Sequence, residues 1–156
     1  MLKRIVEKVT AAIVAPAADA EAAATDRDAA LRLATAVLMV DVARADHSFD
    51  DLEMQRILSL IESHFDVDAD AAAELFASAD ERAEDLIGLH EFTKLLHEHL
   101  SEREKARIVS LLWQVAYADG RLDKYENSLV LKISDLLYVS RARMMRLKHD
   151  AENAPR

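Results

Sequence analysis

Two acidic segments carry the residues whose types and spacing are best suited to chemistry. Each segment has an Asp at the end of an apolar run, a second Asp four residues later, and a Glu three residues after that. We call residues 46–53 the first acidic elbow and residues 119–126 the second, which lies 73 residues further along the chain. Their six acidic residues are the candidate metal ligands: Asp46, Asp50, Glu53, Asp119, Asp123 and Glu126.

Helix capping explains two of the three acidic positions in each elbow. Asp50 and Asp123 precede helical segments, where a carboxylate accepts hydrogen bonds from free backbone N–H groups. The Glu three residues later stands where a capping-box carboxylate reaches back. Capping does not explain Asp46 and Asp119, because a carboxylate at the end of a helix faces the negative pole of the macrodipole.

A cation site is the alternative interpretation of the elbows. Two carboxylates about 5 Å apart repel by ~3 kcal/mol at an effective dielectric near 20, so converging carboxylates need a cation, a basic side chain or a proton. Oxygen ligands suit Ca²⁺ or Mg²⁺, whereas His47 in the first elbow favours a transition metal. The spacing differs from that of an EF-hand. The sequence leaves both interpretations open.

Composition predicts a single all-α domain. The chain has 156 residues, which suits one domain with a substantial core. Two Gly and two Pro leave little turn chemistry for a sheet, and no sustained alternation of β-branched residues is present. The lack of cysteine excludes disulfides, thiolate metal sites and thiol nucleophiles. The formal net charge of -9 argues against nucleic acid as a partner.

Apolar residues at spacings of three and four predict a helical bundle of about seven to eight helices. Thr25 or Asp26 is expected to cap the helix that leads to the first elbow, and Ser101 with Glu104 forms a capping box further on. Residues 78–85 are polar and acidic, and we expect a connection or a frayed helix start there. The expected helices after the N-terminal segment are residues 25–45, 51–63, one from residue 69, 86–99, one from residue 102, 124–137 and 141–150.

The chain contains an internal duplication. Residues 34–65 and 107–138 align without a gap and share eight identities, among them the three acidic positions of the elbows. In this alignment Phe65 pairs with Tyr138. We therefore predict two three-helix repeats, residues 27–79 and 102–150, related by a pseudo-twofold axis.

The expected domain division is residues 1–24, 25–150 and a tail of residues 151–156. The first part comprises an amphipathic helix over residues 2–14 and an Ala-rich linker. Its apolar face packs on the core, on a second copy in a homodimer, or on a membrane surface. No apolar run approaches the roughly 20 residues that cross a bilayer, and Glu7 and Lys8 interrupt any signal-peptide core.

The second elbow resembles a known family. The segment Ala118-Asp119-Gly120-Arg121-Leu122-Asp123-Lys124-Tyr125-Glu126, preceded by Leu112-Trp113-Gln114-Val115-Ala116-Tyr117, is similar to the TerB-like proteins, the tellurite-resistance proteins and their relatives. These relatives include a domain of some DnaJ-like membrane co-chaperones. The resemblance covers about residues 25–150, and the chain looks like the small stand-alone bacterial members. His47 replaces the usual Gly of the first elbow.

The resemblance implies an all-helical, internally duplicated fold whose clustered acidic residues bind a divalent cation. It also implies a non-enzymatic role in tellurite and related stress responses, through protein partners that include membrane-associated complexes. The expected location is the cytoplasm, with a peripheral position at the inner membrane as an alternative. Two alternative functions remain open. One is a purely structural interaction module without an ion, and the other is an enzyme that uses carboxylates as acid and base or as metal ligands.

Overall fold

The computed structural model describes residues 20–45, 51–83, 89–118 and 122–154. Within these residues the protein consists of seven α-helices without a strand, which confirms the predicted all-α class. The helices are α2 (Ala20–Ala43), α3 (Asp51–Phe65), α4 (Ala69–Ala83), α5 (Leu89–His99), α6 (Glu102–Ala116), α7 (Lys124–Leu136) and α8 (Arg141–Glu152). The N-terminal helix expected over residues 2–14 lies outside the described residues.

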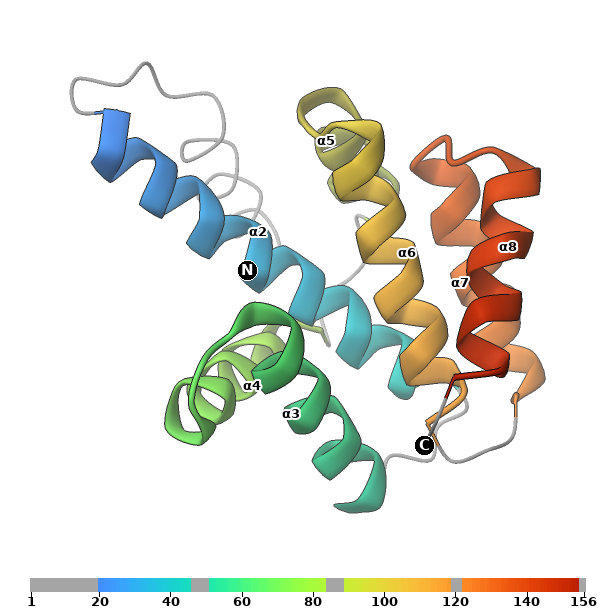
Figure 1. The fold of residues 1–156 in the computed structure, drawn as a ribbon, viewed down its shortest axis with the longest axis horizontal. Coiled ribbons are helices and arrows are strands. Elements are labelled where there is room, and N and C mark those ends of the chain that lie inside the picture. Colours follow the sequence, from blue (N-terminus) through green and yellow to red (C-terminus); the bar gives the residue numbers. More distant parts are fainter. Residues whose placement is uncertain (1–19, 46–50, 84–88, 119–121, 155–156) are drawn as a thin grey trace.

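Helices α2 and α6 form the centre of the fold. They pack against each other, and each carries a third helix of its own half, α4 on α2 and α8 on α6 (Figure 1). Every residue from 33 to 40 is buried, so α2 is enclosed on all sides rather than along one stripe. In α6 the indole of Trp113 is fully buried beside Leu112 and Val109. The core therefore lies between the two central helices.

The two halves share the turn that follows their second helix. Asp66 after α3 and Tyr138 after α7 both have a positive φ, 53° and 58°. The next residue closes the helix end in the same way: Val67 N–H donates to the Glu62 carbonyl at 3.4 Å, and Val139 N–H to the Ser134 carbonyl at 3.0 Å. These equivalent turns lie 72 residues apart. The gap-free pairing of Phe65 with Tyr138 is therefore wrong by one residue at this point.

The third helix of each half begins with the same kind of cap. The Asp68 carboxylate accepts from the Ala71 N–H at 2.8 Å, and the Ser140 hydroxyl accepts from the Arg143 N–H at 3.2 Å. Turn, cap and packing partners thus correspond between α2–α4 and α6–α8. The pseudo-twofold relation between the two halves stays a prediction.

Two predicted helix boundaries are wrong. Helix α2 begins at Ala20 rather than after Thr25 or Asp26, because Ala has the highest helix propensity and the run before Thr25 is rich in it. Helix α4 continues to Ala83 through the segment predicted as a connection or a frayed helix start, and Ala79 within that segment is fully buried. Packing on α2 therefore extends α4 where polarity alone suggested a loop.

The capping box before α6 is confirmed. The Ser101 hydroxyl accepts from the Glu104 N–H, and the Glu104 carboxylate accepts from the Ser101 N–H, both at 3.1 Å. Arg27 of α2 also donates to both Glu104 oxygens, at 3.1 and 3.3 Å. Burial alone would raise the pKa of Glu104, but the bonds from Arg27 and Ser101 outweigh it and lower that pKa. The start of α6 is thereby fixed to α2.

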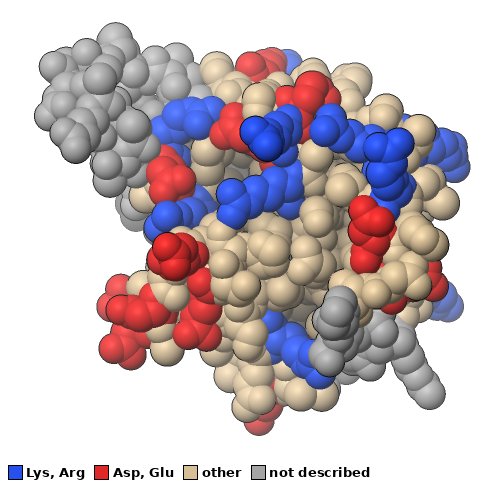
Figure 2. All heavy atoms as spheres, viewed as in Figure 1, with Lys and Arg blue, Asp and Glu red and all other residues tan. Residues whose placement is uncertain are grey.

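Surface charge differs between the two halves. Residues 1–100 contain nine Lys or Arg against 21 Asp or Glu, whereas residues 101–156 contain 11 against eight. Figure 2 shows acidic side chains gathered over α4 and basic ones across the opposite part of the same face. Exposed residues of each kind include Asp70 and Glu74 on α4, and Arg141, Arg143 and Arg146 on α8. The second half therefore carries an excess of basic side chains despite the net charge of -9 of the whole chain.

Candidate cation site at the acidic elbows

Half of the candidate ligands lie in the described part of the chain. Glu53, Asp123 and Glu126 are described, whereas Asp46, Asp50 and Asp119 lie outside the described residues. Within the described part no group of three Asp, Glu or His side chains is close enough to hold a metal ion. The geometry of the site is therefore built from the three described carboxylates.

Asp123 acts as the N-cap of α7. Its Oδ2 accepts from the Tyr125 N–H at 2.7 Å and from the Glu126 N–H at 3.1 Å. The residue has the extended backbone of an N-cap, with φ -72° and ψ 143°. The predicted capping role is confirmed for this residue. Both bonds go to the same oxygen, so capping does not engage Oδ1.

Glu53 and Glu126 line one cavity. Each is the third residue of its helix, α3 or α7, so the two occupy equivalent positions in the two halves. The rest of the lining comes from Ile57 of α3 and from residues at or near the ends of the central helices, Ala43, Val115 and Ala118. Small Ala side chains at these ends leave room for the two carboxylates. The duplication thus brings the Glu of one elbow to the Glu of the other.

The cavity is small. Its volume is about 10 Å³, which is close to the space of a single water-sized species. Glu126 is only 6% exposed, and Glu53 is half-buried. A cavity of this size excludes an organic substrate from the space between the two carboxylates. It is compatible with one ion or one water.

The electrostatics of such a cavity favour positive charge. Carboxylates that share a low-dielectric space favour a positive charge beside them, which a basic side chain, a cation or a proton can supply. Hard divalent cations bind carboxylate oxygen, and Ca²⁺ or Mg²⁺ would need further oxygen ligands. Asp46, Asp50, Asp119 and Oδ1 of Asp123 are the candidates for these positions. The described arrangement thus brings two carboxylates to one small cavity.

Sequence reasoning missed a titratable group close to the first elbow. Asp41 lies on α2, and burial raises its pKa to about 6, although Arg44 and Lys132 act in the opposite direction. The signal was present in the sequence, because Asp41 interrupts a continuous apolar run from Ala36 to Val42. A lone carboxylate within such a run lies next to apolar side chains whichever way the helix turns, and Asp41 is partly buried.

The sequence matches one known protein family. The family model for tellurite resistance protein TerB matches residues 32–149, which include both elbows and all of the second half except the end of α8. The chain belongs to the TerB family. No curated protein and no solved structure gives a significant match. Among the described residues, no helix is long and apolar enough to cross a membrane.

Proposed function

We propose that this TerB-family protein is a non-enzymatic module that holds a divalent cation between its two acidic elbows and acts through protein partners. The observation that carries the proposal is the cavity lined by both Glu53 and Glu126. Each elbow contributes one carboxylate, so an ion bound there connects the first turn of α3 to the first turn of α7. Ca²⁺ and Mg²⁺ are the ions whose ligand preference fits.

A cation at this position would act on the relative placement of the two halves. The cavity is lined by the ends of the central helices as well as by the two Glu residues. Removing the ion would restore repulsion between carboxylates on opposite halves. Ion binding is therefore coupled to the stability of the contact between halves, and so to the surface offered to partners. We propose that this coupling between ion binding and the contact of the two halves acts in a stress response of the tellurite-resistance type.

The cap formed by Asp123 favours a second candidate, a purely structural interaction module. Its carboxylate already satisfies two backbone N–H groups at the start of α7. If the elbows only cap helices, their carboxylates stabilise the fold without any ion. This candidate differs from the first in one measurable property, because it predicts no response of stability to divalent cations or chelators.

Thermal unfolding of the full chain distinguishes the two candidates. The protein is unfolded with Ca²⁺, with Mg²⁺ and with chelator, for the wild type and for the double variant Glu53→Gln/Glu126→Gln. An ion at 100 times its dissociation constant stabilises the folded state by about 2.7 kcal/mol, which raises the midpoint by several degrees. We expect this shift in the wild type and its loss in the double variant.

The matched control is Glu74→Gln/Glu98→Gln, which removes two exposed carboxylates elsewhere on the surface. It changes the net charge by the same amount and should keep the full response to the ion. A wild type that responds to neither ion nor chelator would overturn the proposal in favour of the structural module. An equal response in the Glu53→Gln/Glu126→Gln variant would place the bound ion elsewhere.

A further inference from the structure

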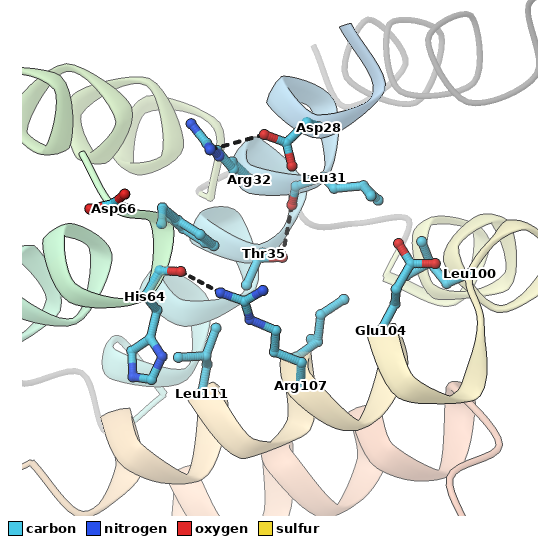
Figure 3. Close-up of a pocket in the computed structure, with 12 residues that line it drawn as sticks. Asp28, Leu31, Arg32, Thr35, His64, Asp66, Leu100, Glu104, Arg107 and Leu111 are labelled. Atoms are coloured by element: carbon cyan, nitrogen blue, oxygen red, sulfur yellow. Dashed lines mark hydrogen bonds and ion pairs between the residues drawn. The ribbon is translucent and has the colours of Figure 1, made fainter. Parts of the chain in front are cut away.

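A groove on the first half lies away from the acidic elbows. It has a volume of about 300 Å³ and lies between α2, α6 and the end of α3 (Figure 3). Its wall is apolar at Leu31, Phe65, Leu100, Ile108 and Leu111. Charged side chains stand around this wall, namely Asp28, Arg32, Asp66, Glu104 and Arg107. An apolar floor with a charged rim is the form of a site that receives one face of an amphipathic helix.

In the second half the corresponding position is filled by α5. Lys105 corresponds to Arg32 when the register of the gap-free alignment is extended by two residues towards the N-terminus. Tyr138 corresponds to Asp66 in the shared turn. His97 of α5 lies between them: its Nδ1 is 2.8 Å from Lys105 Nζ, and its ring centroid is 4.3 Å from that of Tyr138. The side chain of Lys105 is 2% exposed, whereas that of Arg32 is 36% exposed. The same position is covered in one half and open in the other.

The cause of this difference is the course of the chain before each central helix. In the second half a helix break at Leu100 and Ser101 separates α5 from α6, so α5 can fold back along its own half. The residue corresponding to Ser101 is Asp28, which lies inside the continuous helix α2. Its carboxylate pairs with Arg32 one turn on, at 2.9 Å, instead of capping a new helix. The part of α2 before Asp28 therefore continues straight, and the groove is left to another segment.

We propose that residues 2–14 of the same chain dock in this groove as an amphipathic helix, in the place that α5 takes in the second half. This segment precedes α2 and lies outside the described residues. Its apolar residues follow helical spacing: Leu2, Ile5, Val6, Val9 and Ile13. Its polar residues are mainly basic, with Lys3, Arg4 and Lys8 against Glu7. The rim has three carboxylates against two Arg side chains, so its charge complements the basic segment only slightly, and the docking rests mainly on the apolar faces.

The lengths also match. A helix of 13 residues is roughly 20 Å long, and Leu31 lies roughly 17 Å along α2 from Ala20, at 1.5 Å per residue. Residues 15–19 include Pro16, which ends a helix and allows the chain to reverse. A helix that returns antiparallel to α2 therefore reaches Asp28, Leu31 and Arg32. It would cover Leu31 and Phe65, which are only half-buried, whereas Leu100, Ile108 and Leu111 are already buried.

Hydrogen exchange of the full chain, followed by mass spectrometry, tests this docking. We expect amides of residues 2–14 to exchange at least about tenfold more slowly than in an unstructured peptide. Leu31→Lys puts a like charge on the floor beneath the basic segment and should abolish that protection. The matched control is Leu52→Lys, which makes the same change at an exposed Leu on α3.

A second pair of variants acts on the segment and leaves the described fold untouched. Val9→Asp lies on the apolar face and should abolish the protection, whereas Ala11→Asp lies on the opposite helical face and should keep it. Unprotected amides in the wild type, or protection that survives both Leu31→Lys and Val9→Asp, would overturn the proposal. Protection that rises with protein concentration would also overturn it and assign the groove to the segment of a second copy.

Discussion

Replacing Asp41 by Asn should stabilise the protein at neutral pH. Asp41 is an acidic residue on the most buried helix, and burial raises its pKa to about 6 from its ordinary value of 3.8. The folded state thus binds this proton more tightly than the unfolded state does. The stability that the proton contributes is fully present below about pH 4 and is lost as the pH rises through about 6.

The magnitude follows from the pKa difference. At 1.36 kcal/mol per pKa unit, the difference between 3.8 and about 6 amounts to about 3 kcal/mol at pH 7.5. Because the neighbourhood can relax around a charge, we expect Asp41→Asn to gain about 2–3 kcal/mol there. At pH 4 the wild-type carboxyl is protonated in the folded protein, and the gain should fall close to zero.

Urea unfolding followed by circular dichroism at pH 4, 5, 6 and 7.5 measures this difference. The control is Asp135→Asn, which removes an exposed carboxylate from α7 and should show no comparable gain. The reasoning is refuted if Asp41→Asn is no more stable than the wild type at pH 7.5. It is refuted equally by a gain of the same size at every pH, since that would have a cause other than the titration of Asp41.

Other substitutions test the contacts that fix the helices, each by the free energy of unfolding in urea. Lys105→Met should stay within about 1 kcal/mol of the wild type, because a well-packed apolar chain replaces a buried charged one, whereas Lys105→Ala should lose about 2–4 kcal/mol with the packing of its stem. An equal loss in both would show that the bonds to Glu102 and His97 dominate. Ser101→Ala should cost about 1 kcal/mol through the lost cap, and no loss would mean that Arg27 alone fixes Glu104. Asp66→Gly should gain up to about 1 kcal/mol by relieving a positive φ, and a loss would indicate that the Asp66 side chain stabilises the turn.

Helical periodicity and capping chemistry predicted most of the fold. The capping box at Ser101, the caps at Asp68 and Asp123, and the cap at Ser140 all hold in the structure. These features are local, because a cap needs only a few neighbouring residues. The start of α2 was missed for a related reason: a search for cap residues gave too little weight to the helix propensity of the Ala run before Thr25.

The sites depend on contacts that the sequence does not display. Glu53 and Glu126 are 73 residues apart, and only the packing of the two halves brings them to one cavity. Burial of Lys105 was missed because Lys usually lies at the surface, although its spacing from Ile108 and Val109 places it on the apolar face of α6. The groove beside Leu31 was not predicted, because it exists only where the first half has no described helix in the position that α5 takes in the second half. Rules that use neighbouring residues predict the secondary structure of a segment, but they do not predict which of its surfaces stays exposed.

The same duplication explains both the shared cavity and the unshared groove. At the elbows the two copies keep the Glu at the same helix position, and both Glu residues line one cavity. Around the start of α6 and the corresponding part of α2, the two copies differ at both defining positions of the capping box. Asp and Ser are comparable N-caps, so the change from Ser101 to Asp28 alone does not remove a helix start. The capping box also needs an acceptor three residues on, and Leu31 stands where the second half has Glu104. Leu31 thus helps keep α2 continuous, and the same side chain lines the groove that this continuity leaves open.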